Sequence, residues 1–95
     1  MITQDKQILN LIRICQIDDE ERQKLAERFP NLSTNQKSQL RENLLQQLII
    51  DAAEEVVKKA EGQGIANNEE KFPDLYKQIL SLASDKEKES LEEKN

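Results

Sequence analysis

Apolar residues recur at helical spacing through the first part of the chain. Four of them follow the i, i+3, i+4, i+7 pattern of one helix face: Ile8, Leu11, Ile12 and Cys15. This spacing predicts a helix over residues 3–16, with Thr3 as its N-cap. Leu9 and Ile14 lie outside that face, so this helix is apolar on more than one side. Either two neighbouring helices or another chain must cover it.

Two further helix starts carry the capping-box pattern. Asp18 is followed three residues later by Glu21, and Ser33 is followed in the same way by Gln36. Each pair can satisfy free N–H groups in the first turn of a helix. The first box predicts a short helix over residues 19–28. Pro30 ends that helix, because the residue before a proline is displaced from the α conformation.

The longest apolar stretch follows the second box and predicts a third helix over residues 34–61. On a helical wheel its apolar positions cover roughly two-thirds of the circumference, far more than the ~100° stripe of a surface helix. The apolar face also shifts along the helix, so we expect its first half to meet one element and its second half another. Asp51 falls between Gln47 and Glu54 in the polar strip, which predicts a solvent-exposed carboxylate.

The remainder of the chain predicts one more helix and a tail. Gly62 or Gly64 can take the left-handed conformation that ends the third helix. After a polar connector, Pro73 suits the first position of a fourth helix, which is apolar on two sides up to about residue 84. Residues 85–95 alternate acids and lysines. They predict a charged tail, either a helical extension or a disordered segment.

Together these elements predict an all-α fold, a four-helix bundle-like domain with a long central third helix, short loops and a charged C-terminal tail. Residues 1–84 form the domain, and residues 85–95 form the tail. The first two helices pack on one part of the third, and the fourth packs on its second half. The expected core is Ile8, Leu11, Ile12, Cys15, Leu25, Phe29, Leu40, Leu44, Leu45, Leu48, Ile49, Ala52, Val56, Val57, Leu75, Ile79 and Leu82.

The composition removes several kinds of chemistry. The 95 residues include no histidine, one cysteine, two glycines and two prolines. Without histidine there is no catalytic triad and no imidazole ligand for a metal. One cysteine cannot form an intramolecular disulfide or a cysteine-based zinc cluster. We therefore expect no enzymatic activity, no metal or other cofactor and no small-molecule substrate.

The single cysteine also bears on where the protein works. Cys15 lies in an apolar helical pattern, which is typical of a small buried hydrophobic residue. An unpaired cysteine, together with an N-terminal sequence unlike a signal peptide, predicts a reducing, cytoplasmic location. No stretch reaches the ~18 apolar residues that a membrane span requires, so no membrane association is expected.

Nucleic acid is a disfavoured partner, because the net charge is −5 and phosphate binding needs a clustered positive surface. The second and third helices still suggest a helix-turn-helix DNA binder as a weaker alternative. The third helix begins with residue types that read base edges, but its cations there are only Lys37 and Arg41. The four acids that open the second helix, and the length of the third, both argue against this alternative.

An excess of apolar helix surface without a chemical site predicts a small soluble protein–protein interaction module or a self-associating subunit, such as a homodimer. The residues expected to bind a protein partner or a second copy lie off the main core faces: Leu9, Ile14, Ile50, Tyr76 and Leu80. The alternative is an acidic inhibitor or nucleic-acid mimic that binds a basic partner through residues 18–21 and 85–93.

Overall fold

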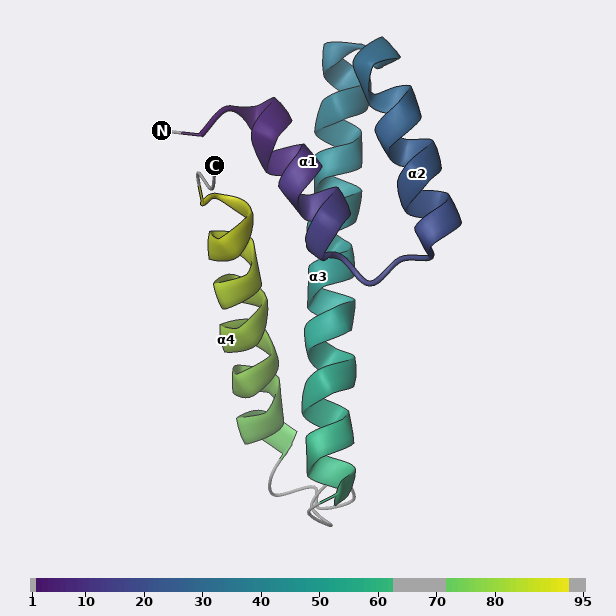
Figure 1. The fold of residues 1–95 in the computed structure, drawn as a ribbon. Coiled ribbons are helices and arrows are strands. Elements are labelled where there is room, and N and C mark those ends of the chain that lie inside the picture. The colour runs from purple at the N-terminus through teal and green to yellow at the C-terminus, as the bar shows by residue number, and fades with distance from the viewer. Residues whose placement is uncertain (1, 63–71, 93–95) are drawn as a thin grey trace.

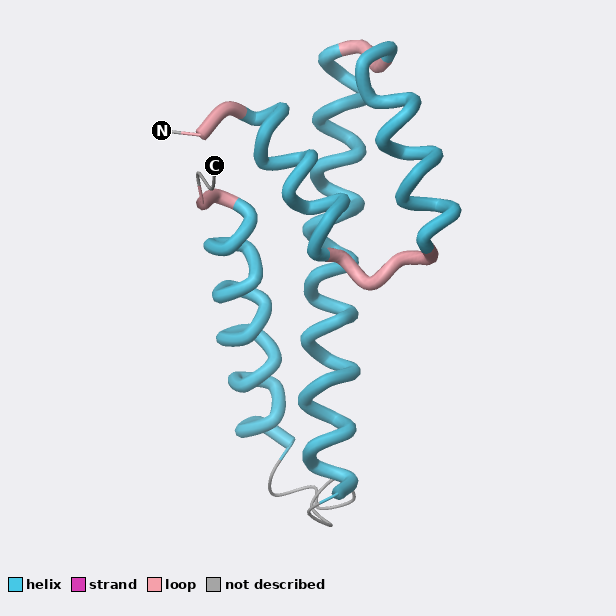
Figure 2. Tube along the Cα trace, viewed as in Figure 1, coloured by secondary structure: helices cyan, strands magenta, loops and turns pink. Residues whose placement is uncertain are grey.

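The computed structural model describes residues 2–62 and 72–92, and these residues form four α-helices, one 3₁₀ turn and no strand. In chain order the elements are α1 (Gln4–Ile14), α2 (Asp19–Arg28), the 3₁₀ turn η1 (Phe29–Asn31), α3 (Thr34–Gly62) and α4 (Phe72–Ser90) (Figures 1 and 2). The predicted all-α fold with a long third helix is confirmed. Gly64, the connector up to residue 71 and tail residues 93–95 lie outside the described residues.

The long helix α3 is the axis on which the other helices pack. Helix α1 lies against its first half, α2 runs back beside that half, and α4 lies antiparallel along its second half (Figure 1). This division follows from the apolar face of α3, which shifts along the helix and so faces different neighbours at its two ends.

The capping signals in the sequence mark the helix starts. At α3 the Ser33 N–H donates to Oε1 of Gln36 at 2.9 Å, and the Gln36 N–H donates to Oγ of Ser33 at 3.2 Å. This is the reciprocal capping box that the sequence predicts. Thr3 accepts from the Lys6 N–H at 3.2 Å as the N-cap of α1. Asp18 occupies the N-cap position of α2 but makes no side-chain hydrogen bond there, so the capping box predicted from Asp18 and Glu21 is wrong.

The hydrophobic core forms two clusters along α3. The first joins α1 and η1 to the first half of α3 and contains Ile8, Leu11, Ile12, Cys15, Phe29, Leu44 and Leu48. The second lies between the second half of α3 and α4 and contains Val56, Ala60 and Leu75. Every member except Ala60 belongs to the predicted core.

Two residues of the predicted core are exposed instead. Ile49 is 46% exposed and Val57 is 38% exposed. The prediction assumed that two neighbours would cover the wide apolar arc in the second half of α3. Among the described residues, α4 packs there on the side that holds Ala52, Val56 and Ala60. The next part of the arc is left uncovered.

The prediction for Asp51 is wrong, because this carboxylate is buried and only 2% exposed. Its Oδ2 accepts from the backbone N–H of Gln16 at 3.0 Å, and its Oδ1 accepts from Nε2 of Gln47 at 2.9 Å. The helical wheel placed Asp51 in the polar strip, but the segment that follows α1 passes over α3 at this level. The two hydrogen bonds offset the desolvation of the buried carboxylate.

Helix α4 continues past the predicted end near residue 84 and ends at Ser90. Ser90 is fully buried against α1. Its Oγ accepts from Nε2 of Gln7 at 3.3 Å, and its carbonyl oxygen accepts from Nδ2 of Asn10 at 2.9 Å. The first part of the predicted tail is therefore a helical extension that ties the end of α4 to the beginning of the chain.

Candidate interaction surface

Two grooves run along the α3–α4 pair, one on each side of its packed interface. One groove, of about 230 Å³, is lined mainly by polar and charged residues: Glu55, Val56, Lys59, Gln78, Ser81, Leu82 and Asp85. The other, of about 210 Å³, is mostly apolar and is lined by Leu45, Leu48, Ile49, Leu80, Ala83, Ser84 and Glu87. The same helix pair thus presents a hydrophilic edge on one side and a hydrophobic edge on the other.

The apolar groove belongs to a larger exposed surface, which we name the α3–α4 face. It consists of the exposed residues Ile49, Ile50 and Val57 and the half-buried Ala53 of α3, with the exposed Tyr76 and Leu80 of α4. Ile49 and Leu80 both line the groove. Ala53 and Val57 lie about one and two turns beyond Ile49, Tyr76 lies about one turn before Leu80, and Ile50 directly follows Ile49. Tyr76 is 56% exposed and Ile50 is 51% exposed. Large apolar side chains are therefore uncovered on both helices.

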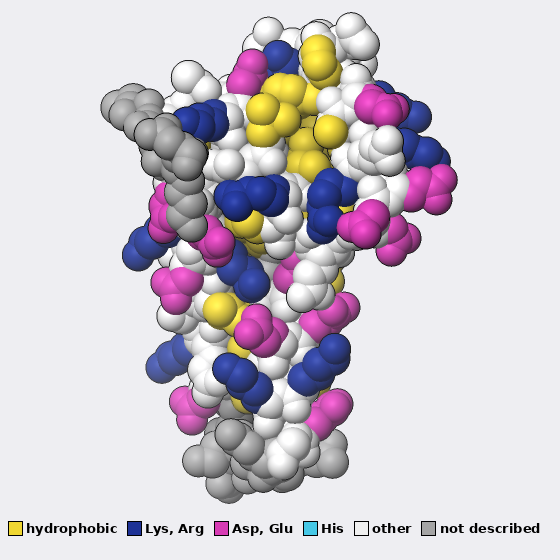
Figure 3. Space-filling view, in the orientation of Figure 1, with side chains coloured by type: hydrophobic (Ala, Val, Ile, Leu, Met, Phe, Trp, Pro, Cys, Tyr) yellow, Lys and Arg dark blue, Asp and Glu magenta, His cyan; other side chains and the backbone are white. Residues whose placement is uncertain are grey.

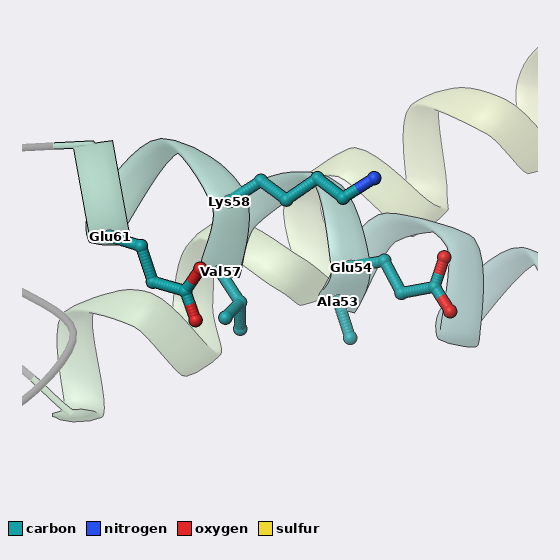
Figure 4. A pocket seen from close by; sticks show the side chains of 5 residues that line it. All are labelled: Ala53, Glu54, Val57, Lys58 and Glu61. Atoms are coloured by element: carbon teal, nitrogen blue, oxygen red, sulfur yellow. The ribbon is translucent and has the colours of Figure 1, made fainter.

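The end of this face on α3 borders a hollow of about 530 Å³, and Figure 4 shows the five described residues that line it. Ala53 and Val57 project from the helix in the same direction, while Glu54 and Lys58 point elsewhere (Figure 4). These described residues all come from one helix, so among them no second element closes a ligand pocket. We interpret this hollow as part of the α3–α4 face.

The structure separates the five residues that the sequence predicted for partner binding. Ile50, Tyr76 and Leu80 lie together on the α3–α4 face. Leu9 is also exposed, at 45%, but it belongs to α1 and lines neither groove. Ile14 is half-buried and packs against the first core cluster. The predicted core included Ile49 and Val57, which were therefore missed as surface residues. The available signal was their position on the same apolar arc as Ile50 and Ala53.

Several polar side chains of the described residues hold the helices together. The Arg22 guanidinium donates to the carbonyl oxygens of Ile12 at 3.0 Å and Cys15 at 3.1 Å, which satisfies free carbonyls at the end of α1. It also pairs with Asp19 at 2.8 Å. Among the described residues, no group of three or more His, Cys, Asp or Glu is placed to hold a metal ion.

Cys15 is packed in the core and is poorly suited to nucleophilic chemistry. Its side chain is 1% exposed, and its Sγ lies 3.4 Å from the carbonyl oxygen of Leu44. Burial, and after it the negative charge of Asp51, raise the pKa of the Cys15 thiol to about 11. The thiolate, which is the reactive form, is therefore scarce at neutral pH.

The two cations at the start of α3, in the segment that could form a helix-turn-helix, are both partly buried. Lys37 forms an ion pair with Asp5 at 3.2 Å, and its Nζ lies 4.8 Å from the centre of the Phe29 ring. Nε of Arg41 is buried. Lys37 is thus engaged within the protein and Arg41 is partly buried, which weakens the DNA-binding alternative.

Acidic side chains lie among basic ones, both in ion pairs and across the side of the molecule that Figure 3 shows. Glu20 pairs with Lys24 at 3.5 Å, and Glu55 pairs with Lys86 at 3.8 Å. Over α3 and α4, the side shown in Figure 3 carries both signs of charge without a continuous acidic area. The acidic-mimic alternative needs such an area, so this distribution gives it little support.

The chain matches no protein-family model, no curated protein and no solved structure. Within the part of the chain that the structure describes, no helix has the length and hydrophobicity needed to cross a membrane. A function must therefore be argued from the geometry of the α3–α4 face.

Proposed function

We propose that this protein is a small helical protein–protein interaction module without catalytic activity, and that the α3–α4 face is its binding surface. The observation that carries the proposal is the joint exposure of large apolar residues from two packed helices. Contiguous apolar patches with a polar rim are typical of interaction sites, because leaving them in water is unfavourable. Glu54, Glu61 and Lys77 are exposed and supply such a rim.

The composition of the surface fits a protein partner better than a small ligand. The apolar groove, at about 210 Å³, is smaller than the ~300–1,000 Å³ of typical ligand pockets, and an aromatic residue, Tyr76, stands beside it with more than half of its surface exposed. Tyrosine is enriched in protein interfaces because it offers a large apolar contact and a polar tip. As part of the same proposal we place the protein in the cytoplasm, where its unpaired buried Cys15 would stay reduced.

Site-specific photo-crosslinking tests this proposal. A benzophenone amino acid replaces Tyr76 on the α3–α4 face or, as the matched control, Gln78 in the polar groove of the same helix. We expect a discrete adduct from position 76 and none from position 78. Adding Ile50→Glu should remove the adduct, since a carboxylate in a desolvated apolar contact is strongly unfavourable.

Equal crosslinking from both positions would contradict the proposal, as would an adduct that survives Ile50→Glu. Ile50 is half exposed, so this substitution should leave the fold intact. A helical circular dichroism spectrum equal to that of the native chain confirms this for each variant.

A further inference from the structure

We propose that the occupant of the α3–α4 face is the same face of a second copy, related by a two-fold axis that runs along the helices. In this dimer α3 of each chain packs antiparallel against α4 of the partner, and the two hairpins form an intermolecular four-helix bundle. This inference rests on the proposed function and names the partner of the same surface. Size, apolar pattern and charge each support it.

The face has the dimensions of a dimer interface. Helix α4 has 19 residues, so at about 1.5 Å per residue it is roughly 28 Å long, and two helices of about 10 Å diameter make the face roughly 20 Å wide. The footprint of the helix pair is then roughly 560 Å², the same order as the ~800 Å² that each partner buries in a stable interface of standard size. A self-complementary face of this size needs no other partner to be covered.

The apolar spacing on α3 also matches a helix packed in a bundle. Ile50, Ala53 and Val57 follow the a, d, a spacing of a heptad, and Ile49 lies beside them toward α4. Leu80 follows Tyr76 by one turn on α4. Each hairpin therefore offers one apolar stripe from each helix, which is what a four-helix bundle requires at its centre.

Charge selects the arrangement of the two copies. On the outer flank of the face, away from the α3–α4 contact, α3 carries the exposed Glu54, Lys58 and Glu61, which together are net negative, and α4 carries the exposed cations Lys77 and Lys88. A two-fold axis along the helices places the acidic flank of α3 against the basic flank of α4 of the partner. An axis across the helices would instead place acid against acid and lysine against lysine, which is repulsive.

Glu61 on the flank of α3 and Lys77 on the flank of α4 lie at about the same level along the helix pair. Ala60 and Leu75 belong to the same buried cluster, and they precede Glu61 and Lys77 by one and two residues. Glu61 and Lys77 thus lie near the same end of the hairpin. Within one chain they project from opposite flanks, so contact between them requires the second copy.

Cysteine trapping tests this arrangement. The double variant Glu61→Cys with Lys77→Cys should form a covalent dimer under mild oxidation, while either single variant should stay largely monomeric. The native Cys15 can be retained because it is buried and its thiol stays protonated. Leu80→Glu added to the double variant should lower the yield of covalent dimer at least tenfold, since it disrupts the apolar contact.

Four results would overturn the inference. The double variant could give no more covalent dimer than the single variants. A single Ala53→Cys variant could give more than the double variant, which would indicate α3 packed on α3. The photo-adduct at position 76 could contain a different protein instead of a second copy, in which case the proposed interaction module stands and the dimer does not. Absence of any specific adduct would refute both.

Discussion

At the scale of single residues, the buried carboxylate of Asp51 is the feature on which several elements converge. It binds the backbone of the segment after α1 and the side chain of Gln47, and its charge contributes to the raised pKa of Cys15. A carboxylate so placed fixes the position of that segment on α3. If these hydrogen bonds are lost, the carboxylate stays buried without partners and the fold becomes less stable.

Asp51→Ala should lower the free energy of unfolding by about 2–3 kcal/mol, because it leaves the Gln16 N–H and the Gln47 amide without their acceptor. Asp51→Asn should cost less, since the amide keeps one acceptor oxygen. Urea denaturation measures both, with Glu42→Ala as the control for loss of an exposed acid from the same helix, expected to change stability by less than about 0.5 kcal/mol. Equal stability of the Asp51→Ala and Glu42→Ala variants would contradict the role assigned to Asp51.

Cys15 should make the free energy of unfolding decrease as the pH rises above 9. Its pKa is raised from 9.0 to about 11 in the folded protein, so as pH rises past 9 the unfolded chain loses the thiol proton while the folded chain keeps it. The stabilisation is fully present below pH 9 and is lost progressively toward pH 11. Urea unfolding at pH 8 and pH 10 should show a larger loss for the native chain than for Cys15→Ala. The two losses would be equal if the thiol did not contribute.

Patterns among residues close in the chain were sufficient to predict the helices. They were not sufficient to predict which distant residues each side chain contacts. The capping box at Ser33 and Gln36 depends on residues close in the chain, so it could be predicted. The burial of Asp51 depends on Gln16, which is distant in the chain. Asp51 follows Leu44 and Leu48 at i+7 and i+3, and that core spacing was the one sequence signal that it faces inward.

At the scale of elements, the last turn of α4 is held against α1 by hydrogen bonds. Ser90 is buried and hydrogen-bonded to Gln7 and Asn10, which brings together residues from the two ends of the chain. This contact was not predictable, because a serine in a charged segment carries no apolar pattern. The prediction of a helix end near residue 84 followed from the loss of that pattern.

Ser90→Ala should lower the free energy of unfolding by about 1 kcal/mol, because the Gln7 amide loses its acceptor in a buried site. Ser84→Ala removes an exposed hydroxyl from the same helix and should be neutral or slightly stabilising, since alanine is the better helix former. Thermal unfolding followed by circular dichroism compares the two. Equal melting temperatures would show that the last turn is not held by Ser90.

At the scale of the whole molecule, the first half of α3 has α1 packed against it and α2 beside it, but its second half has α4 on one side. The apolar arc that the sequence shows is wider than α4 covers, which is why Ile49 and Val57 are exposed. The candidate site could be predicted in part: Ile50, Tyr76 and Leu80 were identified from their positions off the core faces. Their assembly into one face needed the α3–α4 pairing, which depends on contacts across the whole hairpin.

Sedimentation equilibrium of the native chain at increasing concentration tests the central claim most directly. We predict a reversible rise in mass toward twice the 11.0 kDa of one chain. Leu80→Glu on the α3–α4 face should abolish this rise, and Gln78→Glu in the polar groove should preserve it. A native chain that stays monomeric at high micromolar concentration, or a Gln78→Glu variant that loses the dimer as fully as Leu80→Glu, would contradict a self-associating α3–α4 face.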